Sequence, residues 1–432
     1  MNRNLGMTMG SLHALVLKNV TMPDGRVADI TLDDGKVVHV GAPLTAGEVR
    51  DCTGLLVLPA AVDMHVHMRG GLQSGKEDWI TGSRSALAGG VTVVIDQPNT
   101  VPPILIPETL RSRVNEARNR SFCQFAINSG IAAGTNIPAM WRAGALAFGE
   151  IFTAPSSYGE AVHPDVLQAA LAGIGSVNAL ATIHAEEPVH GEDTDLLSHD
   201  RLRPAAGEIR AVRAVGKLSD ASGPIHFCHM STAGAVRVAK TIGTAEVTPH
   251  HLFLSRDSFS PDDTWGKVNP PLRREKERKM LWETWDAIDV VASDHAPHTV
   301  PEKSTGFADA PSGIPGVETM VPLLLDAVLE KRITLASVIE KTSLTPCRIL
   351  GIPKAGFSVN SRADFALYPK KSIPITADCL HSRCGWTPFE GMPAVFPSEE
   401  VMAGMSVFRD GEFVKTPARW FAGRGYIGEH TY

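Results

Sequence analysis

The feature that most constrains this chain is a series of apolar, strand-like runs, each followed directly by a cluster of polar side chains. Such runs occupy residues 91–95, 179–183, 225–227 and 288–292, and helical stretches such as 107–120 and 164–171 lie between them. Strands that alternate with helices over roughly 280 residues are typical of a parallel α/β barrel or a doubly wound sheet. We predict an α/β chain with a (β/α)8 TIM-type barrel over residues 59–350, because chemistry gathers at the carboxyl ends of barrel strands.

The two ends of the chain share a different pattern. Short strand-like runs at 14–20, 28–32 and 36–40 are separated by Asp-Gly turn signals, and similar runs at 364–368, 407–408 and 413–414 flank Asp410-Gly411. Closely spaced strands with such turns are typical of hairpins. We therefore predict one small β-sandwich built from residues 1–58 and 351–432.

The overall charge narrows the classes of partner. The net charge is −6 and the pI is about 6.2, which argues against a general affinity for nucleic acid or an anionic membrane. No apolar run is long enough to span a bilayer, and the first residues lack the apolar core of a signal peptide. The six cysteines are scattered. We expect a cytoplasmic protein with reduced thiols that acts on a small molecule.

One segment indicates a metal site. It reads Asp63-Met64-His65-Val66-His67-Met68-Arg69 and follows an apolar run at 55–62 that is typical of a buried strand. Side chains alternate along a strand, so His65, His67 and Arg69 are predicted to project to one side, with Asp63 alongside. Two imidazoles can bind one zinc-like ion, and an arginine beside them can hold a carboxylate. The segment predicts metal-assisted chemistry on an acidic small molecule.

Further candidate ligands follow the other apolar runs. His184 follows Ile183, His229 comes two residues after Phe227, and Asp294 comes shortly after the run at 288–292. A hydrolytic site with one or two metal ions needs several histidines and a carboxylate around an open position. Together with His65 and His67, these residues supply that set.

This combination resembles the dihydroorotases of the cyclic amidohydrolase superfamily. The resemblance runs in order from about residue 55 to 350. It is carried by the segments at 63–69, 76–78, 88–92, 97–100, 184–186, 229–232, 248–252, 267–273, 293–298 and 313–319. Among them, Asn-Pro-Pro-Leu-Arg at 269–273 and Ser-Asp-His-Ala-Pro-His at 293–298 are specific to the superfamily, and Pro-Asn-Thr at 98–100 leans towards the dihydroorotases.

The resemblance implies an activity and a role for each matching residue. A zinc-dependent enzyme of this family, with one or two ions, interconverts N-carbamoyl-L-aspartate and (S)-dihydroorotate in the third step of de novo pyrimidine (UMP) biosynthesis. His65 and His67 would bind the more buried ion with Asp294, and His184 and His229 would bind a second ion. Asp294 would also be the catalytic proton carrier. The substrate contacts that the resemblance implies are Arg69, Asn99 and His298 at its carboxylate and Asn269 at its ring, with a loop at 296–315 nearby.

Two departures from the family pattern matter. An acidic residue and Pro-Gly usually follow the double histidine, whereas this chain has Gly70-Gly71-Leu72. Many relatives also have a carboxylated lysine between the two ions; here the nearest position is Glu150. A carboxylate offers two anionic oxygens, as a carbamate does, so Glu150 could bridge two cations. Alternatively, Glu150 lies outside the metal site and the site holds one ion.

Two rival functions remain open. An allantoinase or hydantoinase would use the same metal set, but Arg69, Asn99 and His298 favour a substrate with a carboxylate. A catalytically silent homologue that only supports an aspartate transcarbamoylase should have lost metal ligands, whereas this chain keeps all four histidines and Asp294. A homodimer or an association with aspartate transcarbamoylase is the expected assembly.

Overall fold

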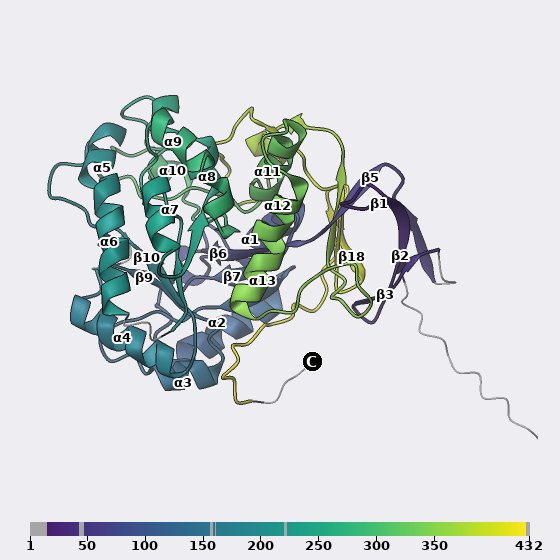
Figure 1. Cartoon of the computed structure of the whole chain (residues 1–432), viewed down its shortest axis with the longest axis horizontal. Helices are drawn as coiled ribbons and strands as arrows, with labels where there is room; N and C mark the ends of the chain where they lie inside the picture. The colour runs from purple at the N-terminus through teal and green to yellow at the C-terminus, as the bar shows by residue number, and fades with distance from the viewer. Residues whose placement is uncertain (1–14, 43–46, 156–158, 160, 220–222, 429–432) are drawn as a thin grey trace, which may run out of the picture.

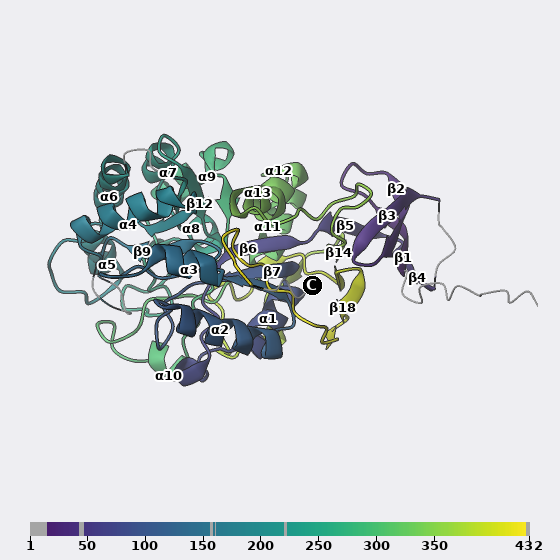
Figure 2. The same cartoon turned by 90° about the horizontal axis from the view of Figure 1, so that it is seen from below.

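The computed structural model describes residues 15–42, 47–155, 159, 161–219 and 223–428. Helices surround a set of parallel strands in one part of the molecule, and a large sheet that includes β1, β2 and β18 lies beside them (Figure 1). The view from below shows the same division (Figure 2). Among the described residues, no helix has the length and apolar character needed to cross a membrane.

Parallel strands form the part of the molecule that carries the helices. One sheet contains three strands and another contains five. Isolated parallel bridges, Ser129–Phe148 and Val66–His295, join the two sheets at both of their edges. The predicted parallel α/β core is therefore confirmed. The strands are β6 (Ala61–Val66), β7 (Val91–Asp96), β8 (Gln124–Ile127), β9 (Phe148–Phe152), β10 (Ala181–His184), β11 (Ile225–Phe227), β12 (Thr244–Val247) and β13 (Val290–Val291).

The helices between these strands follow ordinary sequence rules. The helix predicted at 107–120 is present with those bounds, and the one predicted at 164–171 continues to Ser176. Both begin at a proline, whose fixed φ and missing N–H suit the first helical position. The helices are α1 (Trp79–Ala88), α2 (Pro107–Arg120), α3 (Ile137–Ala143), α4 (Pro164–Ser176), α5 (Leu196–Leu202), α6 (Ala205–Leu218), α7 (Ala233–Ala239), α8 (Pro249–Phe253), α9 (Glu275–Trp282), α10 (Val300–Lys303), α11 (Met320–Leu329), α12 (Leu335–Ile339) and α13 (Thr345–Leu350).

Strands from both ends of the chain share one nine-stranded sheet. The link between the two ends is the antiparallel pairing of β5 with β14, in which Leu55 faces Pro369 and Pro59 faces Phe365. A buried apolar cluster that includes Leu17, Ile30 and Phe365 packs against this sheet. Its strands are β1 (Leu15–Thr21), β2 (Val27–Asp33), β3 (Lys36–Gly41), β4 (Glu48–Asp51), β5 (Leu55–Pro59), β14 (Phe365–Pro369), β17 (Glu399–Met402), β18 (Met405–Arg409) and β19 (Glu412–Phe413).

The apolar run at 55–62 is not the single strand that its sequence predicts. It contains the end of the large sheet, β5, and the start of the parallel sheet, β6. The chain changes sheets at Ala60, whose N–H donates to the carbonyl of Asp364 at 3.0 Å. Pro59 before it has no N–H to continue the ladder. The prediction was wrong because both strands are buried and apolar, so no polar residue marks the change.

Asp364 joins the two β units. Its carboxylate is fully buried and accepts hydrogen bonds from Thr92 Oγ1 (3.2 Å) and Gln124 Nε2 (2.7 Å), which belong to the parallel strands β7 and β8. From the side of the large sheet, the N–H of Ala403 donates at 2.7 Å and Arg362 forms an ion pair at 3.2 Å. The Asp364 carboxylate thus pairs with polar groups from both the parallel strands and the large sheet.

We predict that Asp364→Ala destabilises the protein by about 3–5 kcal/mol, because it leaves the buried Arg362 guanidinium and two amide donors without their acceptor. The midpoint of urea unfolding measures this change. Thr92→Val removes one neutral hydrogen bond from the same carboxylate and is expected to cost about 1 kcal/mol. Equal midpoints for Asp364→Ala and the wild type would show that this contact does not join the two units.

Candidate active site

The candidate site lies where the parallel strands end. His65 is the second-last residue of β6, His184 is the last residue of β10, and Glu150 is in the middle of β9. His229 and Asp294 follow β11 and β13 in the loops beyond them. All five side chains are buried. Strand ends on one side of a parallel sheet are where side chains from distant parts of a chain meet.

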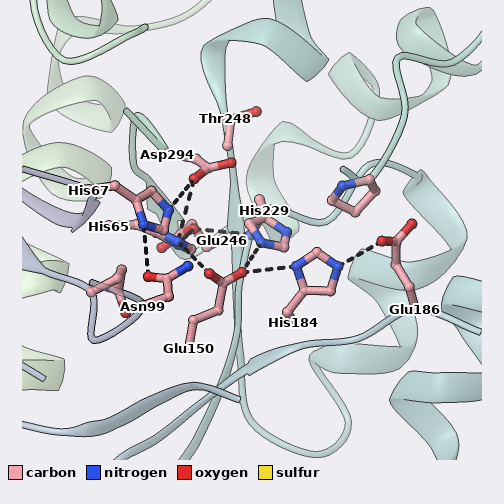
Figure 3. Close-up of polar contacts among 12 residues, drawn as sticks. His65, His67, Asn99, Glu150, His184, Glu186, His229, Glu246, Thr248 and Asp294 are labelled. Atoms are coloured by element: carbon pink, nitrogen blue, oxygen red, sulfur yellow. Dashed lines mark hydrogen bonds and ion pairs between the residues drawn. The ribbon is translucent and has the colours of Figure 1, made fainter. Parts of the chain in front are cut away.

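Glu150 lies at the centre of this cluster (Figure 3). Its Oε1 lies 2.9 Å from His184 Nδ1 and 2.6 Å from His229 Nε2. Its Oε2 lies 3.5 Å from His65 Nε2. Oε1 therefore faces His184 and His229, whereas Oε2 faces His65. Burial raises the pKa of Glu150, but the neighbouring His65, His184 and His229 outweigh it and hold the pKa well below its ordinary value.

Asp294 faces the other side of the same centre. Its Oδ1 lies 3.1 Å from His67 Nε2 and 3.5 Å from His65 Nε2 (Figure 3). Burial alone would raise the pKa of Asp294, but His65 and His67 lower it below its ordinary value. The carboxylate is thus ionised at neutral pH and is able to accept a proton or bind a cation.

The donor atoms fit one or two cations. Two groups of possible ligands have all their donor atoms close together: His65, His67 and Glu150, and Glu150, His184 and His229. His65 Nε2, which faces Glu150, is buried without a hydrogen-bond partner. Imidazole nitrogens with carboxylate oxygens are a donor set that zinc prefers. Glu150 belongs to both groups.

A third group, His65 with Cys228 and Glu246, lies on the other nitrogen of His65. Burial raises the pKa of the Cys228 thiol to about 12, so this group keeps its proton. Glu246 already accepts from His226 Nε2 (3.1 Å) and from the N–H of His229 (3.0 Å). Both oxygens of the Glu246 carboxylate already accept hydrogen bonds, and the Cys228 thiol is neutral. This group is therefore suited to orienting the His65 ring and not to binding an ion.

Two buried carboxylates contact the candidate histidine ligands at the ring nitrogens that face away from Glu150. Glu246 Oε1 lies 3.0 Å from His65 Nδ1, and Glu186 Oε2 lies 2.7 Å from His184 Nε2. Arg203 in turn forms a 2.6 Å ion pair with Glu186. A carboxylate on the far nitrogen of a histidine fixes its ring orientation and makes it a more basic ligand.

Three residues of the site have left-handed backbone conformations: Arg69 (φ 47°), His229 (φ 36°) and Asp294 (φ 45°). Such values are uncommon for residues other than glycine and cluster at functional sites. Strand β6 ends at Val66, before Arg69. The alternation of side chains along a strand therefore does not predict the direction of every side chain from 63 to 69. Asp63 accepts from the N–H groups of His65 (3.2 Å) and Ser293 (3.1 Å), so it is a structural residue of these strands.

The predicted substrate contacts surround a small cavity of about 40 Å³, which Arg69, Asn99 and Asn269 line together with the metal-ligand candidates. A larger cavity of about 570 Å³ shares Asn99 and Glu150 and is also lined by His298. Arg69 Nη2 lies 3.4 Å from His298 Nε2, and Asn99 Oδ1 lies 3.0 Å from His67 Nδ1. Burial lowers the pKa of Arg69 to about 10, so it stays charged at neutral pH.

The structure brings together all ten predicted site residues and adds residues for which we predicted no role. Glu246 is the clearest of these: a charged residue in the short strand Thr244–Val247. A carboxylate inside a buried strand is a signal that could have been used, because such a group needs partners. Glu186 and Lys76 lie in the segments 184–186 and 76–78, which resemble the dihydroorotases. Their contacts were not predictable from those segments.

Known proteins resemble this chain over nearly its whole length. A dihydroorotase of Methanosarcina acetivorans is 40% identical over 425 residues, which cover 91% of each chain. A dihydroorotase of Halobacterium salinarum is 38% identical over 412 residues, covering 92% of this chain and 97% of the relative. A dihydroorotase of Pyrococcus furiosus is 35% identical over 390 residues, covering 87% and 88%. No family model matches the chain.

Solved structures share the fold. The L-hydantoinase (dihydropyrimidinase) of Arthrobacter aurescens superposes with a TM-score of 0.87 at 26% identity, covering 95% of this chain and all of that one. A dihydropyrimidinase of Brevibacillus agri gives a TM-score of 0.85 at 23% identity, with 96% and 100% covered. The three dihydroorotases are 35–40% identical to this chain over at least 87% of its length. The chain belongs to the dihydroorotase family.

We predict that Glu246→Gln weakens the binding of divalent metal about 10- to 100-fold, as loss of a carboxylate behind a ligating histidine usually does. Competition with a chelator measures the change. Glu208→Gln is a matched control, because Glu208 is equally buried but accepts from Ser231 and Thr232 instead of from a candidate ligand. Equal metal affinity in Glu246→Gln and the wild type would contradict an orienting role for Glu246.

Proposed function

We propose that this member of the dihydroorotase family is a cytoplasmic enzyme that interconverts N-carbamoyl-L-aspartate and (S)-dihydroorotate at a site for two zinc ions. The observation that carries the two-ion site is the division of the Glu150 oxygens. Oε1 faces His184 and His229, and Oε2 faces His65. A carboxylate that bridges two cations needs this arrangement. Glu150 would then take the place of the carboxylated lysine that many relatives have.

We further propose that the described parts of residues 59–350 form a closed (β/α)8 barrel and that the described parts of residues 1–58 and 351–432 form a β-sandwich. The bridges Ser129–Phe148 and Val66–His295 support the closure, because they connect the outer strands of the two parallel sheets. The pairing of β5 with β14 supports a single β unit from both chain ends.

His65, His67 and Asp294 would hold one ion and His184 and His229 the other, with Glu150 shared by the two groups of ligands. Zinc at such a site polarises the amide carbonyl and makes water a stronger acid. The protein keeps the reaction away from bulk water, since the candidate ligands are buried. Glu246 and Glu186 hold the rings of His65 and His184 so that the remaining nitrogens face Glu150.

Asp294 is the catalytic proton carrier. In ring opening, its carboxylate accepts the proton of the attacking water and returns it to the departing ring nitrogen. In ring closure, it removes the proton from the ureido nitrogen, because the same group must serve both directions. The neighbouring His65 and His67 hold its pKa below the ordinary value, so it is ionised at neutral pH and able to accept that proton.

The choice of substrate follows from the groups around the cavity. Arg69 and His298 offer donors to a carboxylate, and Asn99 Nδ2 and Asn269 Oδ1 are buried without a hydrogen-bond partner. Dihydroorotate carries a carboxylate next to its ring nitrogen, whereas allantoin and unsubstituted hydantoins have none. A substrate without a carboxylate gives the buried Asn99 amide no anionic acceptor and forgoes the charge-assisted bond to Arg69, which disfavours such substrates.

We predict that Glu150→Gln reduces bound zinc from about two ions to about one per chain and removes most activity. The amide keeps the shape of Glu150 but lacks the negative charge that offsets the second cation, while His65, His67 and Asp294 still hold the first ion. Metal analysis and an assay of dihydroorotate hydrolysis measure both effects. Glu187→Gln is the control, because Glu187 is exposed. An unchanged metal content and rate in Glu150→Gln would place this residue outside the metal site.

We predict that the wild-type enzyme uses dihydroorotate in preference to allantoin and unsubstituted hydantoin. Arg69→Met should lower kcat/KM for dihydroorotate by roughly 30- to 1,000-fold, since loss of a two-pronged bond to a carboxylate costs about 2–4 kcal/mol. The bound metal should not change. A wild-type preference for a substrate without a carboxylate would overturn the proposed function.

A further inference from the structure

Lys76 connects two loops beside the cavity. It lies between the 3-10 turn Gly71–Gln73 and helix α1, and it lines the larger cavity together with His298. Its Nζ lies 2.8 Å from Glu302 Oε1 and 3.2 Å from His298 Nδ1. Glu302 belongs to the short helix α10, so Lys76 contacts two residues of the loop predicted at 296–315.

The ring of His298 is held in place from several sides. His298 is 1% exposed, and its carbonyl accepts from Trp386 Nε1 at 2.7 Å. A side chain at Gly313 would begin only 2.8 Å from His298 Cδ2, so the ring lies directly against the backbone there. Burial and the positive charges of Arg69, Lys76 and Lys303 hold the pKa of His298 well below its ordinary value. The ring is therefore neutral and carries one proton.

The neighbours of the ring decide which nitrogen carries that proton. Lysine only donates, so the 3.2 Å contact with Lys76 Nζ requires a lone pair on Nδ1. A carbonyl only accepts, so the 3.2 Å contact between Nε2 and the Ser312 carbonyl requires a proton on Nε2. The opposite tautomer loses both contacts; it gains the 3.4 Å contact from Arg69 Nη2 and places its Nδ1–H 3.9 Å from Glu302 Oε2. Two contacts of 3.2 Å outweigh contacts of 3.4 and 3.9 Å, which favours the proton on Nε2.

We propose that Lys76 is a positioning residue that holds His298 as the Nε2–H tautomer, so that His298 and Arg69 present donors to the same substrate carboxylate. This inference rests on the proposed function, because it names a determinant of substrate recognition at that site. In this tautomer the Nε2–H that contacts the Ser312 carbonyl and the Arg69 guanidinium lie 3.4 Å apart, so a carboxylate beside them can accept from both. Without Lys76, the tautomer that accepts from Arg69 becomes available, and its lone pair would face the carboxylate.

Kinetics distinguish this role from a simple tether between loops. Lys76→Met removes the donor to Nδ1, and we expect KM for dihydroorotate to rise about 10- to 100-fold, the loss of one charge-assisted bond, with a smaller change in kcat. Lys76→Arg keeps a donor and should recover most of this loss. Glu302→Gln weakens the 2.8 Å ion pair with Lys76 but leaves His298 its donor, so it should stay within a few-fold of the wild type. Zinc content should be equal in all four proteins.

The tautomer itself is measured by ¹⁵N NMR of histidine-labelled holoenzyme, with the His298 signals identified by their loss in His298→Gln. We expect the Nε2–H form in the wild type and a loss of that preference in Lys76→Met. An Nδ1–H or doubly protonated His298 in the wild type overturns the inference. So does an unchanged KM in Lys76→Met, or an equal rise in KM for Glu302→Gln, which would assign the effect to the tether.

The activity of the wild type tests the proposed function separately from the role of Lys76. If wild-type enzyme does not convert dihydroorotate, the proposed function is wrong whatever the NMR spectrum shows. If the wild type is active and Lys76→Met has the same KM and the same tautomer, the function stands and the role of Lys76 falls.

Discussion

The buried carboxylate of Glu150 is the contact on which the rest of the site depends. Removing a carboxylate from water is costly unless cations or donors surround it. Glu150 meets this need with histidines from three different strands or strand ends, β6, β10 and the loop after β11. It therefore holds together residues that are far apart in sequence. The same division of contacts gives each oxygen its own side of the centre.

The surrounding structure works to keep these histidines in one orientation. Glu246 contacts His65, His226 and the backbone of His229, and Glu186 contacts both His184 and Arg203. These negative charges behind the ligands are buried and compensated, so they cost little and fix the rings. Left-handed conformations at Arg69, His229 and Asp294 then aim side chains from the strand ends towards the cavity. Geometry at this site is set by the supporting contacts as much as by the ligand candidates.

Much of the fold and the candidate set could be predicted from the sequence. Apolar runs that end in histidine or aspartate identify strand ends, so His65, His184, His229 and Asp294 were recognisable one by one. The apolar run at 55–62 was misread because burial hides the point where the chain leaves one sheet for another. Supporting contacts were not predictable, since His65 and Glu246 are 181 residues apart and Lys76 and His298 are 222 residues apart. Such pairs depend on the packed arrangement of the strands, which no local pattern encodes.

The most direct test of the two-ion site is the crystal structure of the zinc-loaded enzyme with anomalous scattering recorded at the zinc absorption edge. A two-ion site gives two peaks about 3.5–4 Å apart, one beside His65, His67 and Asp294 and the other beside His184 and His229, with the Glu150 carboxylate between them. A single peak beside His65 and His67, with Glu150 turned away from it, would rule out the two-ion site.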